Sequence, residues 1–308
     1  MTKSLIHIET LCTCHNRIEK TLLSLRDMYA QDLPDGVTVA HTIVDDGSID
    51  GTFVTVKRLF PRVKVLRGDG SLFWAGGMRY GWDLLLRNTV FDYLFLYNND
   101  VRLYADGIKR LLESSRKFSL NYPEKPHVVT ATFVDQYLNF TYGGRNRSSK
   151  WHPLRFKLQE PSLYEDIFVD TLNMNACLMP RRSIQKVGFL SDFFVHGGAD
   201  YEYGLKLKKA GGVTVLAPGI IGRCERNSLK GTSCEKGISL SERYRRLLSL
   251  KEQPVKQRYA YFKRHGGPLW PAIFCGPYFT LLFRHFARCK KTMLIYICRV
   301  FSKKNSAK

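Results

Sequence analysis

The chain has 308 residues, of which 44% are hydrophobic, and a formal net charge of +21 at pH 7. This length can bury a full α/β core of roughly 220 residues and still leave a tail. The first residues lack the charged segment and long apolar run of a secretory signal. The eight cysteines show neither a CxxC pair nor zinc-site spacing, so we expect reduced thiols in a cytoplasmic protein.

Two strand-like segments near the N-terminus each end in polar residues. The first, at residues 4–14, leads into an amphipathic helical pattern, and the two together form half of a βαβ unit. The second, at residues 37–44, runs directly into Asp45 and Asp46. Ligands bind at the carboxyl ends of strands in open α/β sheets, so these acids occupy a position suited to function. An ordinary Asp-Gly turn is the alternative explanation.

A glycine-rich segment follows the third strand, at residues 63–68. We expect Gly76 and Gly77 to precede a helix, so that their free N–H groups face a phosphate, and Arg79 to add a positive charge. The segment is not a P-loop, and no clean GxGxxG follows the first strand, which disfavours a dinucleotide enzyme. Close packing of the backbone is the alternative explanation for these glycines.

The fourth strand, at residues 91–97, ends abruptly in Asn98, Asn99 and Asp100. Oxygen ligands of this kind suit a hard cation such as Mg²⁺ or Mn²⁺, which takes one or two carboxylates and leaves its other positions to phosphates and water. A turn rich in Asn and Asp is the alternative.

Two acids, Asp200 and Glu202, open a short amphipathic helix that stops at Gly211 and Gly212. The helix dipole favours the ionised form of carboxylates in the first turn. These acids are therefore candidates for general-base chemistry, although an N-cap aspartate followed by a first-turn glutamate is the structural alternative.

Taken in order, these segments resemble an inverting glycosyltransferase of family 2 with the GT-A fold, and in particular bacterial rhamnosyltransferases that use dTDP-rhamnose. The resemblance covers about residues 4–225. It implies an α/β fold with a mixed central sheet flanked by helices and a catalytic domain at 1–235. The charge and the aromatic residues of the rest of the chain indicate a basic, helical C-terminal region at 236–308. It rests on the motifs TCHNR, IVDDGSIDGT, GDGSLFWAGGMRYG, LFLYNNDV and GGADYEYGLKLKKAG.

The resemblance implies a nucleotide-sugar donor whose base and ribose lie against the first two strand ends. The positions carried over for donor binding are Thr13, Asn16, Arg17, Asp45 and Asp46.

The metal and base motifs of the family both depart from their usual form in this chain. The Asp-x-Asp motif falls on Asn98, Asn99 and Asp100, so its first acid is replaced by an amide, and we assign the metal to Asp100 and both amides to the donor site. The catalytic base falls on Asp200, which follows Ala199 rather than a glutamate. Glu202 is the fallback.

The chemistry of sugar transfer requires such groups independently of the family. A carboxylate takes the proton of the attacking hydroxyl. The leaving diphosphate needs its charge balanced, which we expect from the metal at Asp100, from Arg79 and from N–H groups around Gly76 and Gly77. One base without a second, covalent carboxylate fits a single displacement with inversion.

Aromatic and amide side chains are candidates for contact with the sugars. Trp74, Tyr201 and Tyr203 offer rings for stacking, although each also suits the core. Asn173 and Asn175 fall on one face of a strand expected at residues 170–180, where they can bond to sugar hydroxyls or serve the strand alone.

Positive charge and aromatic residues are concentrated in the C-terminal region. Residues 241–308 contain 16 Lys or Arg against two Glu. The apolar run Leu269–Phe283 contains two prolines and is too short to span a bilayer. We expect interfacial helices that hold the protein on anionic lipid at the inner face of the cell membrane.

The sequence predicts a metal-dependent inverting glycosyltransferase that acts on a lipid-linked or polysaccharide acceptor in surface polysaccharide synthesis. A catalytically silent, membrane-attached sugar-nucleotide-binding protein is an alternative, because Asn98 weakens the metal motif. A nucleic-acid-binding protein is disfavoured, because the charge lies outside the α/β core. A sugar-phosphate nucleotidyltransferase is disfavoured by the absence of a basic, glycine-rich signature near the N-terminus.

Overall fold

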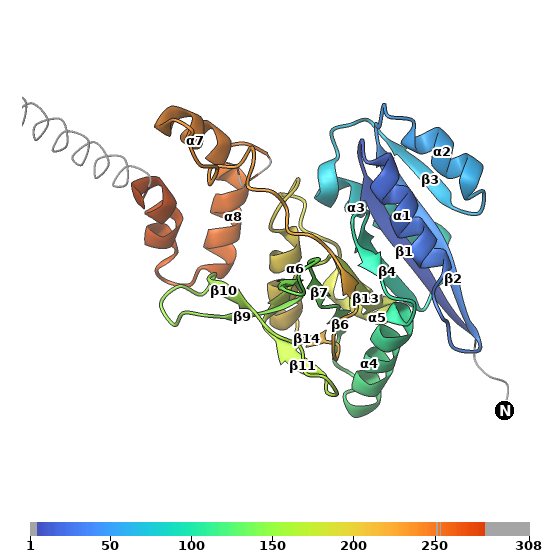
Figure 1. Cartoon of the computed structure of the whole chain (residues 1–308). Helices are drawn as coiled ribbons and strands as arrows, with labels where there is room; N and C mark the ends of the chain where they lie inside the picture. Colours follow the sequence, from blue (N-terminus) through green and yellow to red (C-terminus); the bar gives the residue numbers. More distant parts are fainter. Residues whose placement is uncertain (1–4, 251, 253, 281–308) are drawn as a thin grey trace, which may run out of the picture. The chain divides into compact units, whose positions relative to one another are not determined.

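The computed structural model describes residues 5–250, 252 and 254–280 (Figure 1). The chain forms two compact units, Met1–Ser228 and Leu229–Lys308. We expected the catalytic domain to extend to residue 235.

The first half of the first unit alternates strands and helices. Its four strands correspond to the four strand-like segments of the sequence, and each ends close to the predicted polar residues. The elements are β1 (Ile6–Cys14), α1 (Ile18–Tyr29), β2 (Val37–Asp46), α2 (Thr52–Leu59), β3 (Lys64–Gly68), α3 (Phe73–Asn88) and β4 (Tyr93–Asn98).

The second half has shorter strands and three helices. Its elements are β5 (Arg102–Leu103), α4 (Gly107–Asn121), β6 (His127–Thr130), β7 (Phe133–Val134), β8 (Phe140–Tyr142), β9 (Gly144–Arg147), β10 (Phe156–Leu158), β11 (Ile167–Val169), β12 (Thr171–Leu172), β13 (Ala176–Pro180), α5 (Arg181–Val187), α6 (Ala199–Lys209), β14 (Val213–Leu216) and β15 (Gly222–Arg223).

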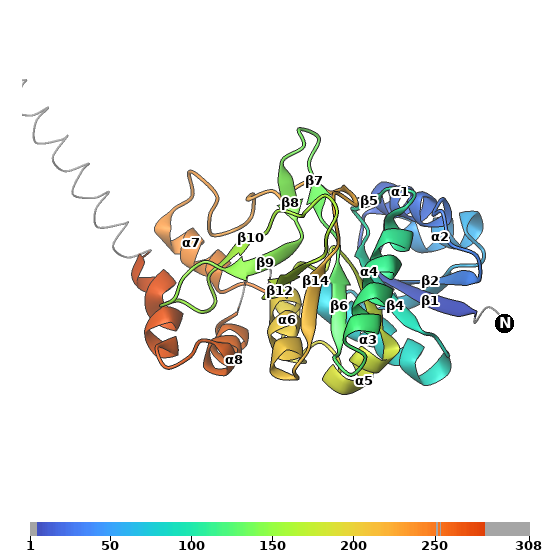
Figure 2. The same cartoon turned by 90° about the horizontal axis from the view of Figure 1, so that it is seen from below.

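The main sheet has eight strands in the order β11-β14-β6-β13-β4-β1-β2-β3. Strands β4, β1, β2 and β3 are parallel, whereas β13 runs antiparallel between β4 and β6. The sheet is therefore mixed, as the sequence predicted. Two smaller sheets, β10-β9-β12 and β5-β15-β7-β8, complete the unit. Helices α1 and α2 lie on one face of the main sheet and α3 on the other (Figures 1 and 2).

Strand β1 is buried on both faces. Ile8 and Cys12 belong to the core cluster that also contains Leu25 of α1, whereas Leu11 and Thr13 face α3. A Cβ atom at Gly77 would lie 2.5 Å from Thr13 Cγ2, and one at Gly81 would lie 2.4 Å from Leu11 Cδ1. The two glycines, one turn apart, thus allow α3 to pack directly on β1.

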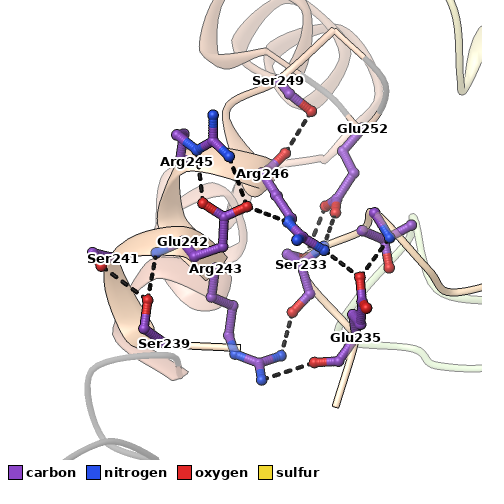
Figure 3. Close-up of polar contacts among 12 residues, drawn as sticks. Ser233, Glu235, Ser239, Ser241, Glu242, Arg243, Arg245, Arg246, Ser249 and Glu252 are labelled. Carbon is purple, nitrogen blue, oxygen red and sulfur yellow. Dashed lines mark hydrogen bonds and ion pairs between the residues drawn. The ribbon is translucent and has the colours of Figure 1, made fainter. Parts of the chain in front are cut away.

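The second unit contains α7 (Leu240–Leu247), α8 (Val255–His265) and a helical segment at residues 270–280. Ser239 caps α7, where its hydroxyl accepts the N–H of Glu242 at 3.2 Å. Figure 3 shows the polar cluster around this helix. The Glu242 carboxylate accepts from Arg245 at 2.7 Å and from Arg246 at 2.5 Å, and Arg246 also pairs with Glu235.

Aromatic residues of the segment 270–280 pack against α8. The ring centroids of Trp270 and Tyr259 are 5.3 Å apart, and those of Phe274 and Phe262 are 6.1 Å apart. The described part of the C-terminal region is therefore largely helical, and its aromatic side chains pack on α8. No helix in the part of the chain that the structure describes is long and apolar enough to cross a membrane. The predicted apolar residues beyond 280 lie outside the described residues.

Candidate active site

The predicted polar residues of three parallel strands meet at one edge of the main sheet. Thr13 of β1 pairs in register with Asn98 of β4, and Cys14 pairs with Asp45 of β2. The next residue of β2, Asp46, is opposite the last residue of β3. Segments that are far apart in the sequence therefore lie together at the carboxyl ends of these strands.

Asn16 and Asp45 shape the loop at the end of β2. Asn16 has a left-handed backbone, with φ of 48°, and its side-chain oxygen accepts the N–H of Ile49 at 2.8 Å. Its own N–H donates to Ser48 Oγ at 2.9 Å, and Asp45 Oδ1 accepts the N–H of Ser48 at 3.1 Å. The two residues are brought together, and each holds the backbone of the same loop.

Asp46 fixes the start of α3. Its side chain is buried, and its two oxygens accept the N–H groups of Gly70 at 2.9 Å, Leu72 at 3.3 Å and Phe73 at 2.8 Å. A carboxylate at a helix N-terminus is also favoured by the helix dipole. Asp46 therefore positions the glycine-rich loop through bonds that use both of its oxygens.

Helix α3 begins at Phe73, earlier than the sequence predicted. Gly76 lies inside its first turn and donates its N–H to Leu72 at 3.1 Å, so this N–H is not free to face a phosphate. Gly77 follows within the helix and packs on Thr13. The expectation of free N–H groups at a glycine loop was wrong for Gly76, because the distant Asp46 carboxylate lets the helix begin sooner.

Arg79 ties α3 to the loop that precedes α6. Its Nη1 donates to the carbonyl oxygens of Ser191 at 3.0 Å and Phe194 at 2.7 Å. The guanidinium is half-buried. In this structure Arg79 thus supports the segment that leads to Asp200.

The two amides at the end of β4, Asn98 within the strand and Asn99 just after it, have different environments. Asn98 accepts a hydrogen bond from Trp74 Nε1 at 2.7 Å. Asn99 is buried and donates to Thr21 Oγ1 of α1 at 3.0 Å. Trp74 is therefore held at the strand-end edge, whereas Asn99 anchors α1. Among the described residues, the buried Oγ1 of Thr13 has no hydrogen-bond partner.

Asp100 lies within a small polar cluster. Its Oδ2 accepts from Arg17 Nη1 at 3.0 Å, and its Oδ1 lies 3.9 Å from Cys224 Sγ. Asn175 reaches the same sulfur at 3.5 Å. The described residues contain no group of three or more acids, histidines and cysteines arranged to hold a metal. A single carboxylate fits Mg²⁺ or Mn²⁺ when phosphate and water supply the other ligands.

Asp200 lies in the first turn of α6, after Gly198 in a left-handed conformation with φ of 91°. Its Oδ2 accepts from Asn173 Nδ2 at 3.2 Å, and its Oδ1 accepts the N–H of Tyr201 at 2.9 Å. Burial raises the pKa of Asp200, against these hydrogen bonds and the positive charge of Arg145, which lower it. Burial therefore acts against the ionised form of Asp200, which the helix dipole was expected to favour. A raised pKa suits a general base.

Arg145 completes the surroundings of Asp200. Its Nε donates to Asn173 Oδ1 at 2.8 Å, and its Cζ lies 5.4 Å from the centre of the Tyr201 ring. Sequence reasoning missed this residue. It lies on β9, a four-residue strand with no alternating apolar pattern to reveal it.

Glu202 and Tyr203 point away from this cluster. Both are fully buried, and the Glu202 carboxylate accepts from Ser191 Oγ at 2.8 Å. The ring of Tyr203 lies 5.8 Å from that of Trp82. Asp200 is thus the partly exposed acid of the pair, and Tyr203 belongs to the core.

Asn173 and Asn175 lie between two strands rather than on the single strand expected at 170–180. Strand β12 ends at Leu172 and β13 begins at Ala176. Asn173 bonds to Asp200, whereas the carbonyl oxygen of Asn175 accepts the N–H of Asn98 at 2.9 Å. The connection between β12 and β13 therefore contacts both Asp200 and the end of β4.

No family model and no curated protein matches this chain. The solved structures that are similar to it include two at 14% sequence identity. The mannosyltransferase PcManGT from Pyrobaculum calidifontis, in complex with GDP-Man and Mn²⁺, has a TM-score of 0.53 and matches over 88% of this chain and 68% of its own. The chain has the GT-A fold. GalNAc-T7 with UDP, GalNAc and Mn²⁺ has a TM-score of 0.56, over 79% of this chain and 48% of its own.

Proposed function

We propose that the protein is an inverting glycosyltransferase that uses a nucleotide-diphosphate sugar. The observation that carries this proposal is the placement of Asp200. It is a partly exposed acid with a raised pKa, joined through the Asn173–Asn175 connection to the end of β4, where Asp100 lies. The GT-A fold supports the same function, because both similar structures contain a nucleotide or a nucleotide sugar together with Mn²⁺.

Asp200 acts as the general base. An acceptor hydroxyl attacks the anomeric carbon while its proton passes to Asp200. The bond between that carbon and the diphosphate breaks, and the nucleoside diphosphate leaves. One displacement from the opposite face inverts the anomeric centre. Asn173 orients Asp200 and, with Arg145, favours its ionised form.

The donor binds along the strand-end edge, where Thr13, Asn16, Arg17 and Asp45 surround its nucleotide. Asp100 would hold Mg²⁺ or Mn²⁺, and such an ion would supply positive charge to the leaving diphosphate. Arg17, half of whose side chain is exposed, is able to turn from Asp100 to the donor.

The donor sugar and the acceptor are proposed from the motif resemblance, and the membrane association is proposed from the charge of the chain. We propose dTDP-rhamnose as the donor sugar and a lipid-linked or polysaccharide acceptor of surface polysaccharide synthesis. The basic C-terminal region holds the enzyme on anionic lipid at the inner face of the membrane.

A thermal-shift panel of UDP-, dTDP- and GDP-linked sugars, each with and without Mn²⁺, tests the function. A ligand that binds only the native state raises the melting temperature. We expect one nucleotide class to raise it, and to raise it further with Mn²⁺. The absence of a shift with every class contradicts the proposal, and a shift without turnover on membrane extracts indicates a silent binding protein.

A further inference from the structure

The loop between β9 and β10 presents an exposed tryptophan. Trp151 is 80% exposed, whereas Trp82 is completely buried and Trp74 and Trp270 are partly buried. The loop extends away from the main sheet (Figures 1 and 2). A single exposed apolar side chain is ordinary on a protein surface, so the surroundings of Trp151 decide whether it has a role.

Hydrogen bonds within the loop fix the backbone on both sides of Trp151. The N–H and the hydroxyl of Ser148 donate to the carbonyl oxygen of Arg155 at 2.8 and 3.1 Å. The N–H of His152 donates to Ser149 Oγ at 3.1 Å, and the N–H of Arg155 donates to the carbonyl oxygen of His152 at 3.0 Å. Because the loop already has a defined structure, little conformational entropy is lost when a partner covers the ring.

The hairpin around this ring is basic. Residues 143–158 contain five Lys or Arg and no Asp or Glu. A cavity of about 560 Å³ lies at the loop, and three cations and two serines are among its lining residues, which are Arg147, Ser148, Ser149, Lys150, Pro153 and Lys157. Neither lysine forms an ion pair within the described part of the chain. The positive charge beside Trp151 is therefore largely uncompensated.

An exposed indole next to cationic side chains suits the boundary between water and a bilayer. Tryptophan is enriched there because its ring is apolar and its N–H can still reach a polar partner. Lysine and arginine are attracted to the negative surface of anionic lipids.

Single-stranded nucleic acid is the competing polyanion. It is bound by grooves in which successive bases stack on several aromatic rings. The other large ring of the hairpin, Phe156, is partly buried and packs 5.8 Å from the ring of Tyr201. Trp151 is thus the one exposed ring of residues 143–158, which favours a lipid surface.

We propose that the β9–β10 loop is a membrane-contact site of the first unit. Trp151 enters the interface of an anionic bilayer, and Lys150 and Lys157 bind the phosphate groups of its lipids. This contact is separate from the one proposed for the basic C-terminal region, and it does not depend on the proposed transfer activity. A single short apolar insertion gives only marginal, reversible binding, so the loop adds to a second contact rather than replacing it.

Fluorescence of the full chain tests the contact at the ring itself. The vesicles contain phosphatidylglycerol and brominated phosphatidylcholine, whose bromine quenches only tryptophans that reach the acyl chains. Trp151→Phe keeps an aromatic ring at the loop and removes its emission. We expect the vesicles to quench the wild-type chain by a larger fraction than Trp151→Phe. Equal fractions in the two proteins overturn the proposal.

Sedimentation with the same anionic vesicles, without bromine, tests the charge. Lys150→Gln/Lys157→Gln and Arg58→Gln/Lys64→Gln remove the same net charge, the second pair at exposed residues of α2 and β3. We expect the partition constant to fall about tenfold or more in the first variant and less than about threefold in the second. Equal losses in both, or no loss in the first, overturn the proposal.

A single-stranded oligonucleotide distinguishes the competing ligand. If the wild-type chain binds it and Lys150→Gln/Lys157→Gln weakens that binding while the vesicle partition stays unchanged, the loop binds nucleic acid and the proposal is overturned. Equal melting temperatures of all variants are the control for folding. The nucleotide-sugar thermal shift tests the proposed function separately, and its failure leaves these vesicle experiments unaffected.

Discussion

At the scale of single residues, the assignment of Asp200 as base makes a direct prediction. Asp200→Asn keeps the size of the side chain and its place beside Asn173, but it cannot accept a proton. We expect kcat to fall by about 10²–10⁴-fold, while the thermal shift produced by the donor stays the same. A lost donor shift contradicts the assignment, because it makes Asp200 a ligand or a structural cap.

The raised pKa of Asp200 predicts the pH dependence of transfer. A base acts in its deprotonated form, so kcat/KM falls as the pH drops through this pKa, which burial places above the ordinary range of an aspartate. Arg145 lowers the pKa, so Arg145→Met should move the acidic limb to higher pH. Arg155→Met, at an exposed arginine in the loop between β9 and β10, is the control. If the acidic limb of the kcat/KM profile does not move in Arg145→Met, the result argues against Asp200 as the base.

Substitutions of Asp100 and Asn98 test the assignment of the metal to Asp100. Asp100→Ala removes the one carboxylate at the end of β4, so we expect loss of transfer and of the extra thermal shift that Mn²⁺ gives with the donor. Asn98→Asp adds a carboxylate and preserves an oxygen that accepts from Trp74 Nε1. It should lower the Mn²⁺ concentration needed for half of that shift. An Asp100→Ala enzyme with unchanged metal response rules the assignment out.

At the scale of elements, substitutions of the glycines in α3 test whether they serve the packing of this helix on β1. A Cβ atom at Gly77 would lie 2.5 Å from Thr13 Cγ2, but one at Gly76 meets only ordinary contacts from 3.5 Å. Gly77→Ala should therefore destabilise the fold by about 1–3 kcal/mol. Gly76→Ala is the matched control and should be neutral or stabilising by up to about 1 kcal/mol. Urea denaturation measures both, and equal effects contradict this packing.

The sequence predicted the strands better than the starts of helices. The four strands of the parallel half were found because their apolar runs end in polar residues. The start of α3 was missed, because the carboxylate that caps it, on Asp46, lies 27 residues before Phe73. A local capping signal cannot show such a contact. Arg145 was missed for a similar reason, since only the pairing of β9 with β12 brings it to Asn173.

At the scale of the whole molecule, charge and fold belong to different parts of the chain. The first unit contains every residue of the candidate site, whereas residues 241–308 contain 16 Lys or Arg against two Glu. Within the second unit, the described arginines around Glu242 are partly neutralised by ion pairs. Residues 281–308 contain eight Lys or Arg and no acid. Attraction to anionic lipid is therefore expected chiefly from this last segment.

Removal of residues 281–308 tests the predicted membrane association without disturbing the packing of Trp270 and Phe274 on α8. The full chain should sediment with anionic vesicles and much less with neutral ones, because each Lys or Arg near an anionic surface contributes about 1 kcal/mol. The truncated chain should remain in the supernatant, and added salt should release the full chain by screening. An equal melting temperature for the two chains is the control for folding. Truncated protein that still sediments with anionic vesicles contradicts a role for this segment.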